Sequence, residues 1–540
     1  MKQITRRDVL KGSMAAGAAF GMPGLFLGQS RAQSGGPNDE IRLAVVGLGD
    51  TKAVGGVGGR GHQLIGRIRE LPGVRIVALC DVNKAFLDRE TKALHDYNDK
   101  IETHADPRRV FDDKSIDAVV VATPNHWHGL ATVWACQAGK DVYVEKPFSH
   151  NLWEGRQMVA AARKYDRMVQ VGTQNRSSTF LRGVFDALRD GRLGDLRYAH
   201  ALVYRPREGI GKVDKPTPPP STVDYDLWCG PAPKEPLMRR QLNYEWHWFW
   251  DTGNGEMGNN GIHVIDICRW ALGQEQAPAR VLSIGGRFGF DDCGETANTH
   301  LAFFDYQPAP LICEVRNLSV AKGPNAIGKF RGRTGGVILD CEGGYFAGDG
   351  TGGALYDHDG KKIEDIASDE NAGKLESTHL ANFLAAVRSR KADDLAAEAH
   401  VGHHSTACCH LANVSHRLGK ATPPEAIRAS IADNKELTDA FDRCSDYLRD
   451  NGVNLDDVPA TLGPLLTYDP DRDRFTGDFA DEANKLARRE TASRSRCPRS
   501  RHETPARRPL ERWPELARSS KRAGHSSHVI PEMSSPNLVA

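Results

Sequence analysis

Short apolar runs alternate with amphipathic stretches along the chain from Ile41 onward. The runs IRLAVVGLG, VRIVALCD, IDAVVVATP and DVYVEKP have the length and β-branched content of buried strands. Helical patterns such as GHQLIGRIREL and HWHGLATVWACQAG lie between them. Strands that alternate with helices at this spacing predict a parallel sheet covered by helices. We therefore expect an α/β domain at residues 37–172.

From about Leu196 the pattern changes to strand-like segments, among them LRYAHALVYRP, THLAFFDY, PLICEVRNLSV and GGVILDCEGG. They predict a second domain of α+β class at residues 173–420, with a largely antiparallel open sheet. The Pro-rich segment KVDKPTPPPSTVDYD is expected to run over the surface. Residues 421–490 follow as a C-terminal extension.

Residues 491–540 differ from the rest, with ten Lys and Arg, four acidic residues and nine Ser. A segment with so little apolar periodicity cannot bury enough surface to fold, so we expect it to be disordered. A basic partner-binding tail and a slip of the reading frame after LARRE are the alternatives.

The first 32 residues have the pattern of an export signal. Arg6 and Arg7 precede a weakly apolar stretch from Ser13 to Gly28, and small residues frame a cleavage site at Ala32. The paired arginines resemble a twin-arginine (Tat) signal. We expect residues 1–32 to be a Tat signal peptide, the Tat export machinery to be a partner, and the location to be periplasmic or otherwise exported. An ordinary Sec signal and a frayed basic tail are the alternatives.

Composition narrows the function classes. The 71 basic and 70 acidic residues nearly cancel, so no nucleic-acid partner is indicated. No apolar run reaches the roughly 18 residues of a membrane helix, so no stable membrane span is expected. The 11 cysteines are scattered without zinc-ligand spacing, and no metal site is predicted.

Glycines after the first strand indicate a dinucleotide cofactor. Gly47 and Gly49 end the strand, and a G-x-G-x-x-G run opens the following helix with Gly56, Gly58 and Gly61. Such glycines let backbone N–H groups approach a pyrophosphate at a helix N-terminus. The run begins nine residues after Gly47, so the phosphate turn is expanded. The pattern predicts a Rossmann dinucleotide-binding domain.

Asp81 ends the second strand, 20 residues beyond Gly61. An acid at this place can bind the ribose hydroxyls of NAD and would repel the 2′-phosphate of NADP. We expect NAD as the cofactor, with NADP the less favoured choice. The alternative role for Asp81 is that of a helix N-cap.

Several further motifs follow in order: ATPxxxH from Ala122 to His128, EKP from Glu145 to Pro147, and G-x-H-x-x-D from Gly261 to Asp266. Together with the glycine turn, they resemble the glucose-fructose oxidoreductase/inositol dehydrogenase (Gfo/Idh/MocA) family over Ile41 to Gly419. The resemblance implies a Rossmann domain followed by an α/β domain whose open sheet makes subunit contacts, and so a homo-oligomer. It also implies NAD(P)-dependent hydride transfer at a secondary alcohol of a sugar, glycoside or cyclitol.

The resemblance also assigns roles to residues. Lys146 matches the lysine that removes the hydroxyl proton, and His263 matches the substrate-side histidine. The residues matched to the cofactor site are Thr123, Pro124, Asn125, His128, Glu145, Lys146 and Pro147. The family often has Asp four residues before the histidine, where this chain has Asn259. An Asp–His relay is then lacking, so Lys146 and His263 share the proton transfer, or Asp266 or Glu256 assists.

The segment EWHWFWDTGNGEMGNNGIHVID, which contains His263, is rich in aromatic rings. Sugars stack their C–H faces on such rings and need polar partners for their hydroxyls. The residues expected to bind substrate are Trp246, His247, Trp250, Asn259, Asn260 and His263. Alternation in WHWFW predicts that one set of rings is buried and that about half lie near the substrate.

Two other functions use the same residues. An NAD-dependent glycoside hydrolase would act by transient oxidation and elimination, and a non-catalytic sugar- or cofactor-binding protein would have no need of a base. An exported protein also has no obvious pool of free NAD. We therefore expect a non-dissociating nicotinamide, with the loop Asp50 to Gly55 closing over the pyrophosphate.

Overall fold

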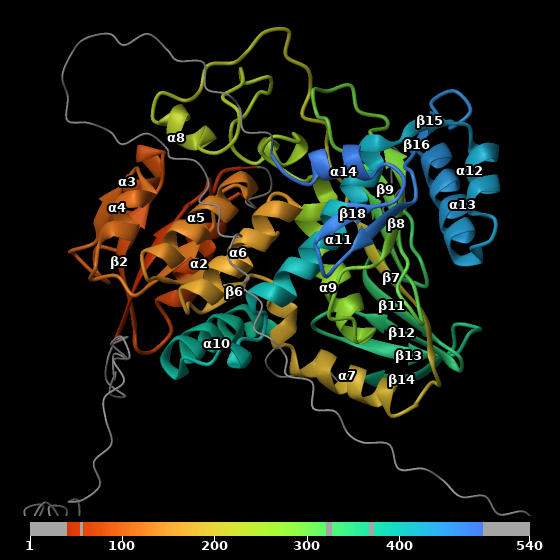
Figure 1. Cartoon of the computed structure of the whole chain (residues 1–540), viewed down its shortest axis with the longest axis horizontal. Helices are drawn as coiled ribbons and strands as arrows, with labels where there is room; N and C mark the ends of the chain where they lie inside the picture. Colours follow the sequence, from red (N-terminus) through yellow and green to blue (C-terminus); the bar gives the residue numbers. More distant parts are fainter. Residues whose placement is uncertain (1–39, 54–57, 320–326, 367–371, 490–540) are drawn as a thin grey trace, which may run out of the picture. The chain divides into compact units, whose positions relative to one another are not determined.

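The computed structural model describes residues 40–53, 58–319, 327–366 and 372–489 (Figure 1). The predicted export signal, Gly56 of the phosphate turn and the tail at 491–540 lie outside the described residues.

The first domain has a parallel sheet of six strands in the order β3-β2-β1-β4-β5-β6. The strands are β1 (Ile41–Val46), β2 (Val74–Cys80), β3 (Glu102–His104), β4 (Ala118–Val121), β5 (Asp141–Val144) and β6 (Val169–Val171). Because the strand order reverses between β1 and β4, a crevice forms outside the carboxyl ends of these strands. The predicted Rossmann fold is confirmed.

Helices cover both faces of this sheet. One face packs against α4 (Pro107–Asp112), α5 (Asn125–Gln137) and α6 (Leu152–Lys164). The other packs against α2 (Arg60–Ile68), α3 (Lys84–Ala93) and α10 (Leu375–Ser389). In α10, Leu380, Phe383 and Leu384 share a core with Leu43 and Val45 of β1. A helix from late in the chain therefore completes the first domain.

The second domain has a sheet of twelve strands, and its main path runs β14-β13-β12-β11-β7-β10-β9-β8-β16-β15. Only β7 and β10 are parallel neighbours among the described pairs, so the predicted largely antiparallel sheet is confirmed. The strands are β7 (Leu196–Tyr204), β8 (Arg280–Gly286), β9 (Thr299–Phe304), β10 (Leu311–Arg316), β11 (Gly335–Cys341), β12 (Gly344–Gly348), β13 (Gly353–Tyr356), β14 (Lys362–Ile366), β15 (Lys420–Thr422), β16 (Ala460–Leu462), β17 (Leu466–Asp469) and β18 (Arg474–Thr476).

Both faces of the central strands of the second sheet are buried, whereas the edge strands are largely exposed. One face packs against α7 (Thr179–Arg189), α9 (Ile262–Ala271), α11 (Ala399–Leu418) and α14 (Ala480–Leu486). The other lies under α12 (Pro424–Ile431) and α13 (Lys435–Asp450). The segment expected as an extension, 421–490, thus supplies three helices and the strands β16 to β18 to this domain.

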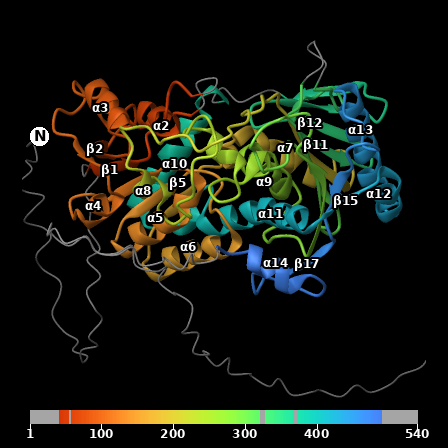
Figure 2. The same cartoon turned by 90° about the horizontal axis from the view of Figure 1, so that it is seen from above.

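Two long connections join the domains. Helix α11 contacts α6 of the first domain and β8 of the second, and Figure 2 shows it lying between them. The Pro-rich segment and the short helix α8 (Tyr225–Cys229) pack on the first domain. There, Asp224 N donates to Val82 O at 3.0 Å, and Trp127 Nε1 donates to Leu227 O at 3.1 Å. We call residues 217–246 the strap.

The cysteines of the described residues are ten free thiols, nine of them buried. No helix in the described ranges is both long and apolar enough to cross a membrane.

Candidate active site

A cavity of about 290 Å³ lies outside the carboxyl ends of β1, β2, β4 and β5. The first domain contributes the glycine turn and the loops that follow these strands. The rest of the lining comes from the strap, from His247, and from the π-helical turn and first turn of α9. The predicted residues brought together here are Gly47, Gly49, Gly58, Asp81, Thr123, Pro124, Asn125, Glu145, Lys146, Pro147, Trp246, His247, Asn259 and His263. The sequence motifs thus converge on one cavity.

The glycine turn is shaped for close approach to an anion. Gly47 and Gly49 have φ of 88° and 78°, in the left-handed region that favours glycine. A Cβ on Gly61, in the first turn of α2, would lie 1.9 Å from the carbonyl oxygen of Gly47. The start of α2 therefore packs directly on the turn. This arrangement fits the pyrophosphate of a dinucleotide at a helix N-terminus.

Unpaired polar atoms support the same fit. The buried side-chain oxygens Oγ1 of Thr123 and Oε1 of Gln174 have no hydrogen-bond partner among the described residues, and both residues line the cavity. Buried polar atoms are normally paired, so these two oxygens are suited to meet a bound polar group.

Asp81 supports the turn as well as facing the cavity. Its carboxylate accepts from Leu48 N at 2.7 Å and from Asn83 N at 2.8 Å, and burial raises the pKa of Asp81 above its ordinary value. The alternative N-cap role is wrong, because Asn83 caps α3. Gly49 N is a third backbone partner, and because a carboxylate has roughly four acceptor positions, room remains for a ribose hydroxyl.

Lys146 links the two domains. Its Nζ donates to the backbone oxygen of Asn259 at 2.8 Å and to Asn259 Oδ1 at 3.1 Å. Asn259 lies on a π-helical turn, Met257–Gly261, that leads into α9. Such turns often occur at functional sites. Burial lowers the pKa of Lys146 to about 8, so a neutral amine is accessible near physiological pH.

His263 lines the same cavity from the first turn of α9. Burial lowers the pKa of His263 well below its ordinary value, and the nearby cations Lys146 and Arg60 lower it further. The imidazole is therefore neutral and can donate or accept one hydrogen bond to a substrate hydroxyl.

The aromatic segment folds differently from the expectation. Glu245–Trp248 is a 3₁₀ turn, so the two-residue alternation predicted for WHWFW is wrong. Trp246 and His247 are stacked, with ring centroids 3.6 Å apart, and both line the cavity. Burial lowers the pKa of His247 to about 3. These two rings form a flat, uncharged wall.

Four predicted residues lie outside the cavity lining. Gly61 packs behind the turn, and Trp250 lies under the guanidinium of Arg417. Asn260 contacts Glu256 and Arg205. Both ring nitrogens of His128 face backbone oxygens, Pro147 O at 2.7 Å and Thr123 O at 2.9 Å, so this histidine joins the loops that follow β4 and β5.

Sequence reasoning missed two arginines. Arg60 lines the cavity and donates to Glu145 Oε1 at 2.8 Å, and it also pairs with Glu376. Arg207 pairs with Glu256, which is fully buried, and donates to Tyr244 OH at 2.7 Å. Arg60 stands inside the glycine run, which could have indicated it. Arg207 follows β7 in an irregular segment that carries no local signal.

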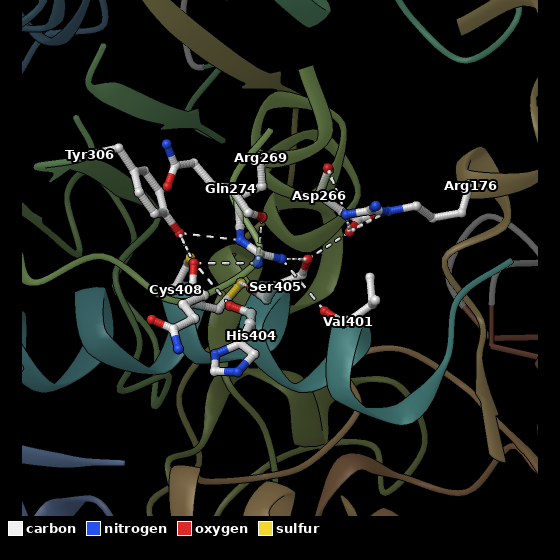
Figure 3. Close-up of polar contacts among 11 residues, drawn as sticks. Arg176, Asp266, Arg269, Gln274, Tyr306, Val401, His404, Ser405 and Cys408 are labelled. Atoms are coloured by element: carbon white, nitrogen blue, oxygen red, sulfur yellow. Dashed lines mark hydrogen bonds and ion pairs between the residues drawn. The ribbon is translucent and has the colours of Figure 1, made fainter. Parts of the chain in front are cut away.

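Asp266, which like Glu256 was considered as an assistant in proton transfer, forms its hydrogen bonds with residues outside the cavity (Figure 3). Its carboxylate accepts from Arg176 at 2.8 Å and from Ser405 Oγ at 2.6 Å. Ser405 also accepts from Arg269, which donates to Tyr306 OH at 3.2 Å. This buried network joins α9 to α11 and to the turn after β6, and so it fixes the helix that carries His263.

Comparisons with known proteins concern the two domains that enclose this cavity. Residues 41–173 match the sequence model described as oxidoreductase family, NAD-binding Rossmann fold, and residues 208–300 match that of the oxidoreductase family C-terminal alpha/beta domain. The parallel sheet and the first of these matches both indicate an NAD-binding Rossmann domain. Both sequence models are those of the Gfo/Idh/MocA family, so the chain is similar to that family over residues 41–173 and 208–300.

Among its relatives, a glycosyl hydrolase family 109 protein of Solibacter usitatus is 35% identical over 28% of this chain and 36% of the relative. Another of that name, from Saccharopolyspora erythraea, is 30% identical over 38% of this chain and 47% of the relative. The chain thus spans less than half the length of these relatives. The WlbA dehydrogenase of Bordetella pertussis, solved with NADH and UDP-GlcNAcA, has a TM-score of 0.50 at 19% identity, covering 70% of this chain and 97% of that chain. That similarity concerns the fold.

Asp266→Ala should lower the free energy of unfolding by about 3–5 kcal/mol, because it leaves the largely buried guanidinium of Arg176 without its carboxylate and removes the acceptor of Ser405. Asp439→Ala is the control, since Asp439 forms an exposed pair with Lys435 and its loss should cost less than about 1 kcal/mol. Urea unfolding followed by circular dichroism measures both. Equal losses in the two variants would contradict a role of Asp266 in fixing α9.

Proposed function

We propose that the protein transfers a hydride between a secondary alcohol of a sugar, glycoside or cyclitol and NAD, with Lys146 as the base. The observation that supports this most is the position of Lys146. Its amine lies in the cavity that also contains the glycine turn and Asp81, and burial lowers the pKa of Lys146 to about 8. An amine that loses its proton near neutral pH suits proton abstraction from a hydroxyl.

The cavity residues have separable roles toward the cofactor. The glycine turn would hold the pyrophosphate, and Asp81 the ribose, where its charge favours NAD over NADP. The loops that follow β4 and β5 would hold the nicotinamide end. When bound, NAD supplies the hydride acceptor.

The second domain would hold the substrate. The stacked rings of Trp246 and His247 offer an uncharged face for the C–H groups of a sugar. Neutral His263 can bind a hydroxyl while Lys146 accepts the proton of the reacting one. As the C–H bond delivers its hydride and Lys146 takes the proton, the alcohol becomes a carbonyl.

A second candidate is an NAD-dependent glycoside hydrolase, and the names of the relatives favour it. Oxidation of the sugar would acidify the neighbouring C–H bond, elimination would release the aglycone, and water addition and reduction would follow. Release of aglycone without net NADH distinguishes this reaction from simple oxidation.

Lys146→Met should lower kcat by roughly two to four orders of magnitude, because the apolar side chain keeps the length but cannot accept a proton. A screen of sugars, glycosides and cyclitols, scored by nicotinamide absorbance and by aglycone release, provides the assay. Lys84→Ala, an exposed lysine of α3, is the control. A kcat of Lys146→Met within threefold of the parent would remove Lys146 from the reaction.

The pH dependence should show the same base. Below about pH 8 Lys146 is protonated and cannot accept, so kcat/KM for alcohol oxidation should fall about tenfold per pH unit on the acidic side. Above this pH the amine is neutral and the rate should level off. A rate that stays constant between pH 6 and 9 would contradict a base with this pKa.

The strap suggests how the cofactor would be retained by a protein exported through a Tat signal. Trp228, Leu242 and Trp246 of the strap line the cavity together with Val82 and Asn83 of the first domain. Asn243 Nδ2 also donates to Asp50 Oδ2 at 3.0 Å, at the start of the expanded glycine turn. Release of NAD would require these contacts to open, so we propose that the nicotinamide is reduced and reoxidised in place by two substrates.

Protein purified without added NAD should therefore carry close to one nicotinamide per chain after gel filtration, as measured by denaturing extraction. Trp228→Ala removes a buried ring of the strap and should speed the exchange of bound for added NAD by about tenfold or more. Met238→Ala, an exposed residue of the same strap, should exchange at the parental rate. Cofactor-free protein that needs added NAD for every turnover would refute retention.

A further inference from the structure

Asn259 occupies the position where the resemblance led us to expect an aspartate, and the structure places both of its oxygens on Lys146. The backbone oxygen lies 2.8 Å from Nζ, and Oδ1 lies 3.1 Å from it. One residue thus provides two acceptors for the same amine.

The orientation of the Asn259 side-chain amide is fixed by Glu256, which lies on the side away from Lys146. Its Nδ2 lies 3.5 Å from Glu256 Oε2, and a carboxylate can only accept hydrogen bonds. Glu256 in turn accepts from Arg207 Nη2 at 3.0 Å and from Arg207 Nε at 3.3 Å. With the amide nitrogen held by Glu256, the amide oxygen must face Lys146.

These contacts have different consequences for the two forms of the lysine. A neutral amine has two N–H groups and one lone pair, so donation to both oxygens of Asn259 leaves only the lone pair free. An ammonium group has three N–H groups and would present a donor to the substrate instead. Lys146 lines the cavity, so the remaining position faces the substrate.

We propose that Asn259 is a positioning residue that holds both N–H groups of neutral Lys146 and leaves its lone pair as the base, with Glu256 and Arg207 fixing the Asn259 amide. Asn serves here better than Asp because it accepts hydrogen bonds without adding a negative charge that would stabilise the ammonium form. This inference rests on the proposed function for its catalytic meaning.

The charges around Lys146 are compatible with this role. The two nearby carboxylates are each paired with an arginine, Glu145 with Arg60 and Glu256 with Arg207. The nearby histidines are neutral because burial lowers the pKa of each. The titratable groups that face Lys146 are Glu145, Arg60, Glu256, Arg207, His263, His247 and His128. A carboxylate introduced at position 259 would differ from Glu145 and Glu256, because it would contact the amine of Lys146 directly and would have no arginine as its own partner.

The test compares Asn259→Asp with Asn259→Ala, since both remove the amide but only Asp adds a charge. Competitive labelling of the purified protein with acetic anhydride, read by mass spectrometry, gives the pKa of Lys146 without any substrate. We expect Asn259→Asp to raise the pKa of Lys146 by roughly one to three units. Asn259→Ala should lower kcat, by up to about tenfold for one lost hydrogen bond, without raising that pKa.

The acidic limb of the kcat/KM profile should follow the labelling result and move to higher pH in Asn259→Asp only. An unchanged pKa in Asn259→Asp, or an equal rise in Asn259→Ala, would overturn the proposal. If Asn259→Asp does not fold, the double variant Glu256→Gln/Asn259→Asp keeps the number of carboxylates near Lys146 unchanged. A smaller rise is then expected, because the charge of Glu256 also raises the pKa of Lys146.

The labelling also separates the two proposals. A raised pKa in Asn259→Asp together with no redox activity of the parent protein would leave the assignment of Asn259 standing and reject the proposed function. Redox activity of the parent protein together with an unchanged pKa of Lys146 in Asn259→Asp would support the proposed function and reject the role of Asn259.

Discussion

The site depends on one contact between the domains, the amine of Lys146 on the two oxygens of Asn259. Lys146 follows a strand of the first sheet, and Asn259 belongs to a π-helical turn of the second domain. A lysine removed from water needs either a counter-charge or hydrogen bonds that suit its neutral form. This chain provides hydrogen bonds, and they join the π-helical turn of the second domain to the edge of the crevice.

Buried ion pairs then place the elements that make this contact. Arg60 with Glu145 fixes the strand end beside Lys146, and Arg207 with Glu256 fixes the turn of Asn259. Asp266 with Arg176 fixes α9 behind His263. Each pair satisfies charges that would be costly to leave alone, and each joins segments far apart in the sequence. The geometry of the cavity is therefore set by electrostatics as much as by apolar packing.

Local patterns were enough to predict the elements and most of the cavity. The apolar runs gave the parallel strands, and the glycine spacing, Asp81 and EKP gave the cofactor side, because parallel strands end at one edge of a sheet. The missed features all depend on contacts between distant segments. The strap contacts Val82 and Trp127, which precede it by 100 residues or more, and Arg207 pairs with Glu256 from an irregular segment. Trp250 lies outside the cavity because the segment before it forms a 3₁₀ turn and not a strand with alternating side chains. Sequence periodicity does not encode such pairings.

The packing of α10 on the first sheet has a consequence for the synthesis of the protein. Leu380, Phe383 and Leu384 cover strands that leave the ribosome more than two hundred residues earlier. Until α10 is made, the apolar face beneath it stays open, and a fragment ending after β6 would expose that face to water. The first domain thus cannot finish folding as an N-terminal unit. Its last core helix, α10, is synthesised only after most strands of the second sheet. The two domains therefore complete their folding together, and the cofactor crevice forms late in synthesis.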